Sequence, residues 1–319
     1  MSVYPFRFEP IYKKTIWGGR NLARLFGRRL PRGAIGESWE LADLPGSVSR
    51  VANGPRAGSG VGGLMRRFGG DLLGDAKPTP DGRFPLLLKF LDANDTLSLQ
   101  VHPDAAAVRR ISRDGGAAAM KTECWYIVES RGGFIYKGVR PRVSRRAFRA
   151  AVESDSVEGL VRRIDVAAGD FHYIPAGVVH ALGAGVVLAE VQTPSDTTYR
   201  VTDWGRGREI HTDLAMQCIR LGLTGDRCPG RRAGRLLATD YFSVWRRNLG
   251  AGQSRYLPKG RCLAIMIIAG RGAASHEGDA PREVSFKAGD TLLVPAAMRR
   301  PAIVAKSNCT WLEIGLPER

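Results

Sequence analysis

The stretch V-A-A-G-D-F-H-Y-I-P-A (166–176) recurs further along the chain as F-K-A-G-D-T-L-L-V-P-A (286–296), and this repeat decides the fold. Both copies place Gly-Asp at a tight turn, follow it with a short apolar strand and end that strand at a proline. Two copies of one β unit predict two stacked β modules. The copies then diverge, because the first leads to His180 and the second has Arg300 at the corresponding position.

Short apolar strands separated by Gly, Pro and Asp turns surround the two copies, as is typical of sandwiches and barrels. Two amphipathic stretches, 144–163 and 212–223, predict flanking helices. The fold class is therefore mainly β, with two jelly-roll modules over 1–230 and 231–319 and a few flanking helices. The clearest predicted strands are 86–90, 96–102, 123–129, 133–136, 170–174, 186–192, 263–268 and 291–294.

The composition is that of a folded protein with reduced thiols. The 319 residues are 44% hydrophobic and 25% charged, and the five cysteines have no C-x-x-C spacing. This pattern argues against a disulfide framework and against a cysteine-based zinc site. No apolar run approaches the roughly 20 residues of a membrane helix, and the N-terminus is unlike a signal peptide. We therefore expect a cytoplasmic protein with no membrane partner.

The formal net charge of +17 is the unusual feature of the composition. It is compatible with nucleic acid, a membrane surface or an anionic substrate. The arginines occur as scattered pairs such as Arg66-Arg67 and Arg109-Arg110, with no aromatic-interleaved stripe and no nucleic-acid motif. We expect no nucleic-acid partner. An anion- or nucleic-acid-binding protein is kept as a third hypothesis, which predicts steep salt dependence and no need for metal.

Three separate segments carry side chains that suit a divalent metal ion. In L-S-L-Q-V-H (97–102), strand alternation sends Ser98, Gln100 and His102 to one face. The same period places Glu123 beside Lys121. The spacing G-x5-P-x-G-x2-H that ends at His180 resembles the second motif of the cupins, which are metal-binding jelly rolls. Zinc accepts imidazole nitrogen and carboxylate oxygen, and a catalytic site leaves a position for water or substrate.

Several runs, taken together with their order and gaps, resemble type I mannose-6-phosphate isomerases in their short bacterial form. The resemblance is strong over residues 5–210 and weak beyond. The runs are W-G-G (17–19), G-E-S-W-E (36–40), K-F-L (89–91), L-S-L-Q-V-H-P-D (97–104), K-T-E-C-W-Y (121–126), G-D-F-H-Y-I-P-A-G-V-V-H (169–180), E-V-Q (190–192) and D-T-T-Y-R-V-T-D-W (196–204).

The resemblance implies a zinc-dependent aldose-ketose isomerase that interconverts mannose 6-phosphate and fructose 6-phosphate through an enediol(ate). It implies one Zn²⁺ per chain, a sugar-phosphate substrate, and a specific set of residues. The implied metal ligands are Gln100, His102, Glu123 and His180. The implied catalytic residues are Arg200, Lys121, Glu190 and Asp196. The substrate-binding candidates are Lys89, Lys121 and Arg200, together with Ser98 on the ligand face. The base stays open among Glu190, Asp196, Lys121 and metal-bound water.

Another metal-binding cupin, either an iron oxygenase or a sugar-phosphate sensor, is the main alternative. Cupin oxygenases usually carry His-x-His followed closely by Glu, whereas here Gln100 replaces the first His and Glu123 lies far beyond His102. A sensor could dispense with some of the charged residues that the resemblance assigns to catalysis. The other histidines, His172, His211 and His276, are expected to be structural. We expect a monomer or a weak homodimer.

Overall fold

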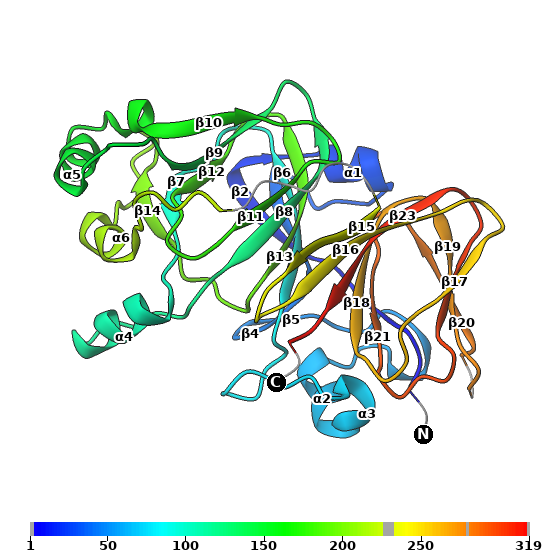
Figure 1. Cartoon of the computed structure of the whole chain (residues 1–319). Helices are drawn as coiled ribbons and strands as arrows, with labels where there is room; N and C mark the ends of the chain where they lie inside the picture. Colours follow the sequence, from blue (N-terminus) through cyan, green and yellow to red (C-terminus); the bar gives the residue numbers. More distant parts are fainter. Residues whose placement is uncertain (1–2, 226–232, 279–280, 318–319) are drawn as a thin grey trace.

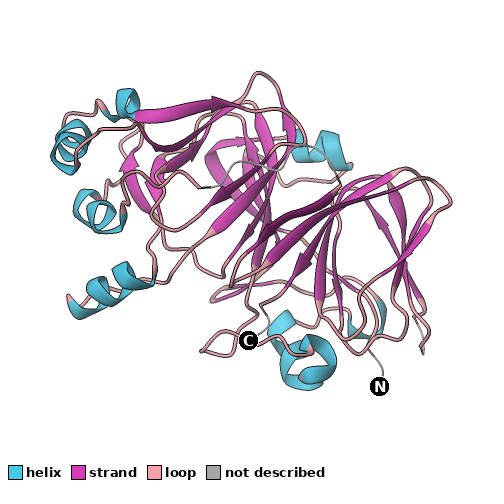
Figure 2. Ribbon diagram, viewed as in Figure 1, coloured by secondary structure: helices cyan, strands magenta, loops and turns pink. Residues whose placement is uncertain are grey.

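The computed structural model describes residues 3–225, 233–278 and 281–317, and two stacked β modules dominate it (Figure 1). Strands outnumber helices, which lie at the periphery (Figure 2). The first jelly roll contains β6 (Leu87–Ala93), β7 (Leu99–Val101), β8 (Glu123–Ser130), β9 (Phe134–Val139), β10 (Val161–Asp165), β11 (Phe171–Ile174), β12 (His180–Leu182) and β13 (Val186–Gln192).

The second jelly roll repeats the strand order of the first. The order β11-β8-β13-β6 in one sheet recurs as β21-β18-β23-β16, and β10-β9-β12-β7 recurs as β20-β19-β22-β17. This repetition confirms the mainly β, two-jelly-roll fold predicted from the two sequence copies. Its strands are β16 (Ser243–Leu249), β17 (Ser254–Tyr256), β18 (Leu263–Ala269), β19 (Arg271–Ser275), β20 (Glu283–Lys287), β21 (Thr291–Val294), β22 (Ala302–Ala305) and β23 (Cys309–Gly315).

The Gly-Asp turns of the two copies have the same geometry. Gly169 has φ +91° and Gly289 has φ +88°, values that favour glycine. In the first turn the Asp170 carboxylate accepts a hydrogen bond from the Ala167 amide at 2.8 Å. In the second turn Asp290 accepts one from the Lys287 amide at 2.9 Å. The repeated sequence therefore encodes a repeated turn, which leads into β11 and β21.

The remaining elements extend or cover the jelly rolls. The additional strands are β1 (Phe6–Arg7), β2 (Ile11–Gly19), β3 (Ile35–Leu41), β4 (Asp43–Leu44), β5 (Ser47–Val48), β14 (Tyr199–Thr202) and β15 (Gly234–Ala238). The helices are α1 (Asn21–Phe26), α2 (Val61–Phe68), α3 (Gly70–Leu73), α4 (Ala105–Arg113), α5 (Arg145–Glu153) and α6 (Thr212–Cys218), with 3₁₀ turns η1 (Gly54–Arg56) and η2 (Val157–Leu160). Within the described ranges no helix has the length and apolar character needed to span a bilayer.

The two modules are joined by pairing and by packing. The short strand β1 pairs with β21, so a segment near the N-terminus completes a sheet of the second module. A single apolar cluster contains Phe90 and Tyr126 of the first module with Met266 and Leu312 of the second. The predicted boundary between residues 230 and 231 lies outside the described residues, and the division into 1–230 and 231–319 stays a prediction.

The sheet that contains β8, β13 and β6 has a different role on each face. One face packs on the second module, where the Arg246 guanidinium lies 5.8 Å from the Tyr126 ring. The other face points into the first jelly roll, where Trp125 and Leu188 belong to a separate buried cluster. Residues two apart on a strand share a face, and so do residues paired across strands. Glu123, two before Trp125, and Glu190, paired with Trp125, therefore also point into this interior.

Three predicted elements differ from the structure, and one of them, the helix predicted over 212–223, ends at Cys218. The strand predicted over 96–102 is ordered as β7 only from Leu99, because side chains bond the carbonyls of the residues before it, although the Leu97 amide still donates to Leu182. Trp204 Nε1 donates to the Leu97 carbonyl and Arg206 donates to the Thr96 carbonyl. The helix predicted over 144–163 ends at Glu153, near Asp155 with φ +51°, and the chain continues as η2 and β10.

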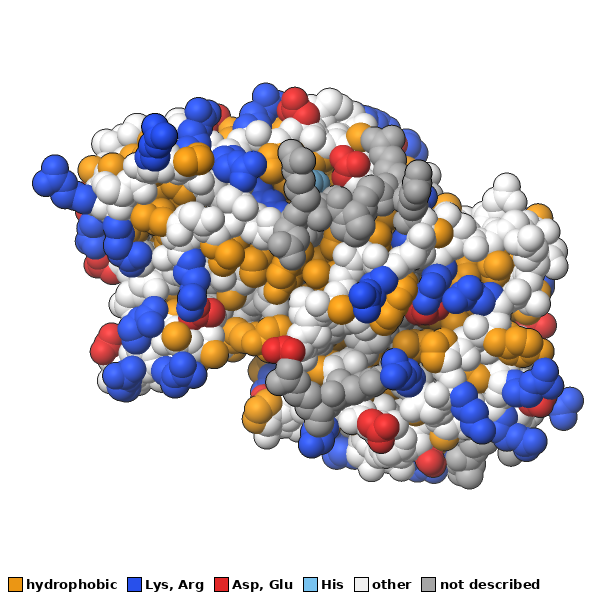
Figure 3. All heavy atoms as spheres, in the orientation of Figure 1, with side chains coloured by type: hydrophobic (Ala, Val, Ile, Leu, Met, Phe, Trp, Pro, Cys, Tyr) orange, Lys and Arg blue, Asp and Glu red, His pale blue; other side chains and the backbone are white. Residues whose placement is uncertain are grey.

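The basic residues are distributed over the molecule. On the face shown in Figure 3, Lys and Arg side chains form separate groups with hydrophobic and acidic side chains between them. They form no continuous basic stripe on that face.

Candidate metal centre and active site

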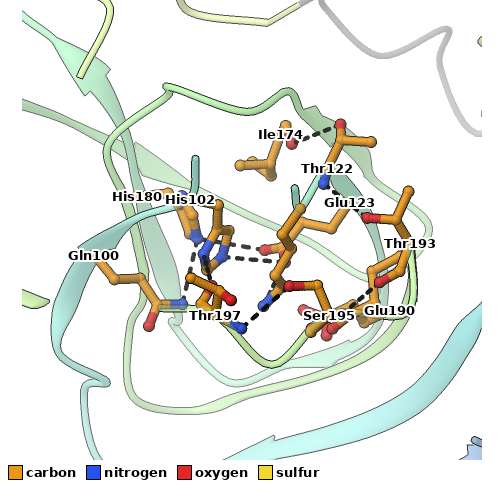
Figure 4. Close-up of polar contacts among 12 residues, drawn as sticks. Gln100, His102, Thr122, Glu123, Ile174, His180, Glu190, Thr193, Ser195 and Thr197 are labelled. Atoms are coloured by element: carbon orange, nitrogen blue, oxygen red, sulfur yellow. Dashed lines mark hydrogen bonds and ion pairs between the residues drawn. The ribbon is translucent and has the colours of Figure 1, made fainter. Parts of the chain in front are cut away.

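Three side chains from distant parts of the sequence converge inside the first jelly roll (Figure 4). His102 Nε2 lies 3.3 Å from Glu123 Oε2, and His180 Nε2 lies 3.3 Å from Glu123 Oε1. All three residues are buried, and one ligand atom from each lies within 4.8 Å of the others. Each carboxylate oxygen thus faces one imidazole nitrogen, which is the arrangement that a shared divalent ion would use.

Both sheets of the jelly roll contribute to this cluster. His180 begins β12, where it pairs with Gln100 of β7 on one side and Lys137 of β9 on the other. His102 directly follows β7, and Glu123 begins β8 in the facing sheet. Antiparallel register therefore brings the three together, although the sequence separates them widely.

The hydrogen bonds of the two imidazoles suit a metal. His102 Nδ1 lies 3.0 Å from the Thr197 carbonyl and His180 Nδ1 lies 2.9 Å from the Val178 carbonyl. A protonated Nδ1 on each ring leaves an Nε2 lone pair toward Glu123. Within the described chain, His102 Nε2 and both Glu123 oxygens are buried without a hydrogen-bond partner. Unpartnered buried acceptors are costly, and a cation at their centre would satisfy all three.

Gln100 lies at the edge of the same cluster. Its side-chain Nε2 is 3.3 Å from His180 Nε2. The nitrogen and oxygen of an amide are exchanged by rotation about the last side-chain bond. Gln100 can therefore place its oxygen where its nitrogen lies now, close to His180, and could act as a fourth, neutral metal ligand.

Lys121 gives the cluster a positive neighbour. Its ammonium lies 3.1 Å from Glu123 Oε2. Although burial acts to raise it, the pKa of Glu123 lies well below its usual value because Lys121 and His102 favour the charged form. Burial and then Lys121 lower the pKa of His102 to about 3. The carboxylate is therefore ionised and His102 is neutral at pH 7, as metal ligation requires.

A second charged cluster lies on the same interior face. The Lys89 ammonium is 3.2 Å from Glu190 Oε1 and 3.4 Å from Glu37 Oε2. Each carboxylate also accepts an indole hydrogen bond, Glu190 from Trp125 at 2.9 Å and Glu37 from Trp39 at 2.7 Å. The buried Lys89 ammonium thus forms ion pairs with both carboxylates, and each carboxylate also accepts a hydrogen bond from a tryptophan.

The two carboxylates of this cluster differ in acidity. The pKa of Glu190 is raised, first by burial and then by the charge of Glu123. Burial also acts to raise the pKa of Glu37, but Lys89 and the Trp39 hydrogen bond lower it overall. The pKa of Lys89 is raised despite its burial, because Glu37 and Glu190 favour the ammonium form. Glu190 is therefore the carboxylate more readily protonated.

Glu37 was not among the predicted site residues, and Trp39 was expected to be a core residue. The signal was present, because G-E-S-W-E (36–40) is one of the runs that carry the family resemblance. Its alternation places Glu37 and Trp39 on one face of β3, and the pairing of Trp39 with Lys89 across β3 and β6 directs that face inward.

The remaining predicted site residues, Arg200, Ser98 and Asp196, lie outside the His102–Glu123–His180 group. Arg200 pairs with Gln100 across β14 and β7, and its guanidinium donates to the Glu209 carbonyl at 2.6 Å. Ser98 is buried just before β7. Asp196 is exposed and lines a neighbouring cavity. The site roles of these residues stay predictions.

The histidines predicted to be structural include two with satisfied partners. His211 Nδ1 accepts a hydrogen bond from the Arg200 amide, and His276 Nε2 lies 3.1 Å from the Pro281 carbonyl. His172 is on β11, with its Nε2 buried and without a partner among the described residues. Burial and then Lys137 lower its pKa to about 4.

Residues 5–125 match the family model for the catalytic domain of type I phosphomannose isomerase. Full-length relatives extend the similarity to most of the chain. A mannose-6-phosphate isomerase from Streptococcus mutans is 32% identical over 91% of this chain and 94% of its own length. The mannose-6-phosphate isomerase ManA from Bacillus subtilis is 34% identical, over 97% of this chain and 98% of its own.

Solved structures agree with the sequence comparisons. The crystal structure of the mannose 6-phosphate isomerase from Bacillus subtilis superimposes with a TM-score of 0.85 at 30% identity, covering 98% of this chain and 99% of that one. The apo form of the mannose 6-phosphate isomerase from Salmonella typhimurium gives a TM-score of 0.76 at 15% identity, with 98% and 99% covered. The second similarity concerns the fold alone.

Proposed function

The chain belongs to the mannose-6-phosphate isomerase family, and we propose that it interconverts mannose 6-phosphate and fructose 6-phosphate with one zinc ion per chain. As a member of this family it is an aldose-ketose isomerase. The observation that carries the proposal is the buried group of His102 Nε2, His180 and the two Glu123 oxygens, in which Glu123 forms an ion pair with Lys121 but His102 Nε2 and both oxygens lack a hydrogen-bond partner in the described chain. Gln100 would supply a fourth ligand, which leaves room for substrate at a zinc site that can expand its coordination.

Bound zinc would act as a Lewis acid toward the sugar oxygens on which negative charge develops, a contribution of several kcal/mol. The donor set of imidazole nitrogen and carboxylate oxygen suits zinc, and it also suits other transition metals. The absence of the His-x-His motif and the family membership both disfavour the oxygenase alternative.

Cationic side chains of the chain itself would complete the charge balance. Lys121, at 3.1 Å from Glu123, is close enough to the metal centre to stabilise an enediolate oxygen. Arg200 shares a register position with Gln100 on β14 and would bind the phosphate, since a guanidinium matches phosphate bidentately. Ser98 and Lys89 would contact the substrate from the same interior.

Glu190 is our choice for the base. It would remove the proton from C2 while the electrons of that bond form the C1=C2 double bond and the C1 carbonyl electrons move onto O1, giving the enediol(ate). The O2 proton would pass to O1, and Glu190 would return its proton to C1 as the C2 carbonyl forms. Its carboxylate is fixed by Lys89 and Trp125, yet each oxygen keeps a second lone pair. Its raised pKa makes it a stronger base than an exposed glutamate. Asp196 would remain a secondary acidic group at the edge of the site.

A coupled assay for fructose 6-phosphate tests the proposal, run on the purified protein, after chelation, and after addition of zinc, manganese or cobalt. His102→Ala and Glu123→Ala should lose bound metal and turnover together. Arg200→Ala should keep about one metal per chain, measured by elemental analysis, while kcat/KM falls by at least about 100-fold because a phosphate contact is lost. Full turnover by a metal-free preparation would contradict the proposal.

A further inference from the structure

A cavity of about 1080 Å³ lies beside the metal centre, between the first module and the end of the described chain. Its walls include the loop that precedes β6, drawn in cyan next to the C-terminus in Figure 1, and Pro317. Pro78, Pro80 and Pro194 are also in the wall, so much of it is conformationally restricted. The cavity is therefore largely preformed.

A hydrogen-bonded wall separates this cavity from the metal cluster. Thr193 Oγ1 donates to the Met120 carbonyl at 3.2 Å, and Ser195 Oγ donates to the Ala119 carbonyl at 3.0 Å. The segment with Ala119 and Met120 continues into Lys121 and Glu123, and the segment with Thr193 and Ser195 follows β13. The cavity lining includes none of the four ligand candidates, and it includes neither Lys89 nor Glu190. It shares Trp39 with the Lys89 cluster, and it shares Asp196 with the predicted catalytic residues.

The cavity combines apolar walls with two available ammonium groups. Lys13 donates to Ser47 Oγ at 2.8 Å and lies 4.4 Å from the centre of the Trp39 ring. Lys77 is exposed at the rim. Within the described ranges no carboxylate lies at ion-pairing distance from either lysine. Lys13 keeps hydrogen-bond donors beyond the one directed at Ser47, so both ammonium groups can pair with an anion.

The acidic residues of the lining leave an excess of positive charge. Asp81 is paired with Arg83 at 2.9 Å, so these two charges compensate each other. The other charged residues of the lining are one carboxylate, Asp196, and two lysines, Lys13 and Lys77. An anionic group is therefore favoured between the two lysines.

We propose that this cavity is a second ligand site, which binds an amphipathic organic anion with an aromatic body. The volume suits a molecule of drug-like size, since such ligands occupy cavities of about 300–1,000 Å³ with mostly apolar walls. Trp39 and Tyr241 provide aromatic surface for the body of the ligand, and Lys13 and Lys77 pair with its carboxylate, sulfonate or phosphate. A preformed, proline-rich wall keeps the ordering cost of binding low.

Titration with 8-anilinonaphthalene-1-sulfonate, followed by its fluorescence, tests the charged part of the site in the metal-loaded, full-length protein. We expect one saturable site. Lys13→Ala and Lys77→Ala should each weaken binding about two- to fivefold, the range for a partly exposed ion pair. Lys14→Ala is the matched control, because Lys14 is the exposed neighbour of Lys13 and does not line the cavity. Equal affinities for all three variants would overturn the proposal.

A second pair of variants tests the aromatic wall. Tyr241 is 38% exposed and lines the cavity, whereas Tyr256 is 63% exposed and lies outside it. Tyr241→Ala should weaken binding at least about threefold through lost apolar contact, and Tyr256→Ala should not. If Tyr256→Ala weakens binding as much as Tyr241→Ala, the probe binds elsewhere and the assignment is wrong.

Competition with substrate decides whether the site is separate. Saturating mannose 6-phosphate should leave the affinity for the probe unchanged within twofold. Complete displacement of the probe by mannose 6-phosphate would make the cavity part of the substrate cleft and overturn the proposal. Binding is read from fluorescence and needs no turnover, so this test can fail or succeed whatever the outcome of the isomerase assay.

Discussion

At the scale of single residues, the site depends on how each charged group is held. His102 and His180 have their Nδ1 atoms engaged by backbone carbonyls, which leaves the opposite nitrogens for Glu123. Lys89 is held between Glu37 and Glu190. In both clusters the charged groups interact directly with one another, so substitution of one residue changes the pKa of its neighbours.

Glu37→Gln is expected to move the pH dependence of the reaction. The amide keeps an acceptor for Trp39 but removes a negative charge, so Lys89 then compensates Glu190 alone and the pKa of Glu190 falls. The acid limb of the kcat/KM profile should shift to lower pH, with bound metal unchanged. Glu153→Gln, at an exposed glutamate that pairs with Arg149 on α5, is the control. An acid limb that does not move in Glu37→Gln would contradict Glu190 as the base.

His102 should make the metal-free protein sensitive to mild acid. Burial and then Lys121 lower its pKa from 6.5 to about 3, so the unfolded chain binds a proton that the folded chain does not. This stability is present above pH 6.5 and is lost as the pH falls toward 3, by up to about 1.4 kcal/mol per pH unit. Urea unfolding at pH 7 and 5.5 with a chelator measures it. His102→Asn should have a smaller slope, and equal slopes would refute the assignment.

At the scale of elements, the Gly-Asp turns explain why the repeat could be recognised from the sequence. The same four local features recur at each turn: a glycine with positive φ, an aspartate cap, a following strand and a final proline. Local chemistry of this kind needs no distant partner. The strand over 96–102 was less predictable, because Trp204 and Arg206 determine where its ladder begins.

Gly289→Ala should destabilise the second module more than an ordinary glycine substitution does. An added Cβ would lie 2.6 Å from Phe26 Cγ, and φ is +88°. Left-handed backbone costs about 1–2 kcal/mol and overpacking adds about 1–3 kcal/mol, so the free energy of unfolding should fall by at least about 2 kcal/mol. Chemical denaturation measures this change.

Gly252→Ala is the matched control for that substitution. Gly252 has φ +78°, and an added Cβ would have no heavy atom within 4 Å beyond its chain neighbours. The free energy of unfolding of Gly252→Ala should fall only by the cost of placing alanine in the left-handed region, about 1 kcal/mol. Equal losses for both variants would mean that the contact with Phe26 does not constrain the turn.

At the scale of the whole molecule, the two jelly rolls depend on each other. The sheet behind the metal centre packs its outer face on the second module, with Phe90, Tyr126, Met266 and Leu312 in one cluster. The strand β1 reaches across to pair with β21. The second module therefore packs against the sheet whose strands β8 and β13 carry Glu123 and Glu190.

A truncated chain of residues 1–230 is expected not to fold as a stable unit. Removal of the second module would expose the outer face of the β8–β13–β6 sheet and leave β1 without its partner. Large exposed apolar faces promote aggregation. We expect insoluble protein or loss of cooperative thermal unfolding, in contrast to the full chain. A soluble 1–230 fragment that unfolds cooperatively and binds metal would contradict this dependence.

The sequence by itself determined the mainly β fold and its duplication, because turn and strand signals are local and occur twice. Through family resemblance it also nominated the residues of the site, of which the structure brings His102, Glu123 and His180 together. Only the tertiary structure decided that Glu37 and Trp39 join Lys89, and that a cavity adjoins the metal centre. These features depend on the register between strands distant in sequence, and register is set by packing across the whole fold.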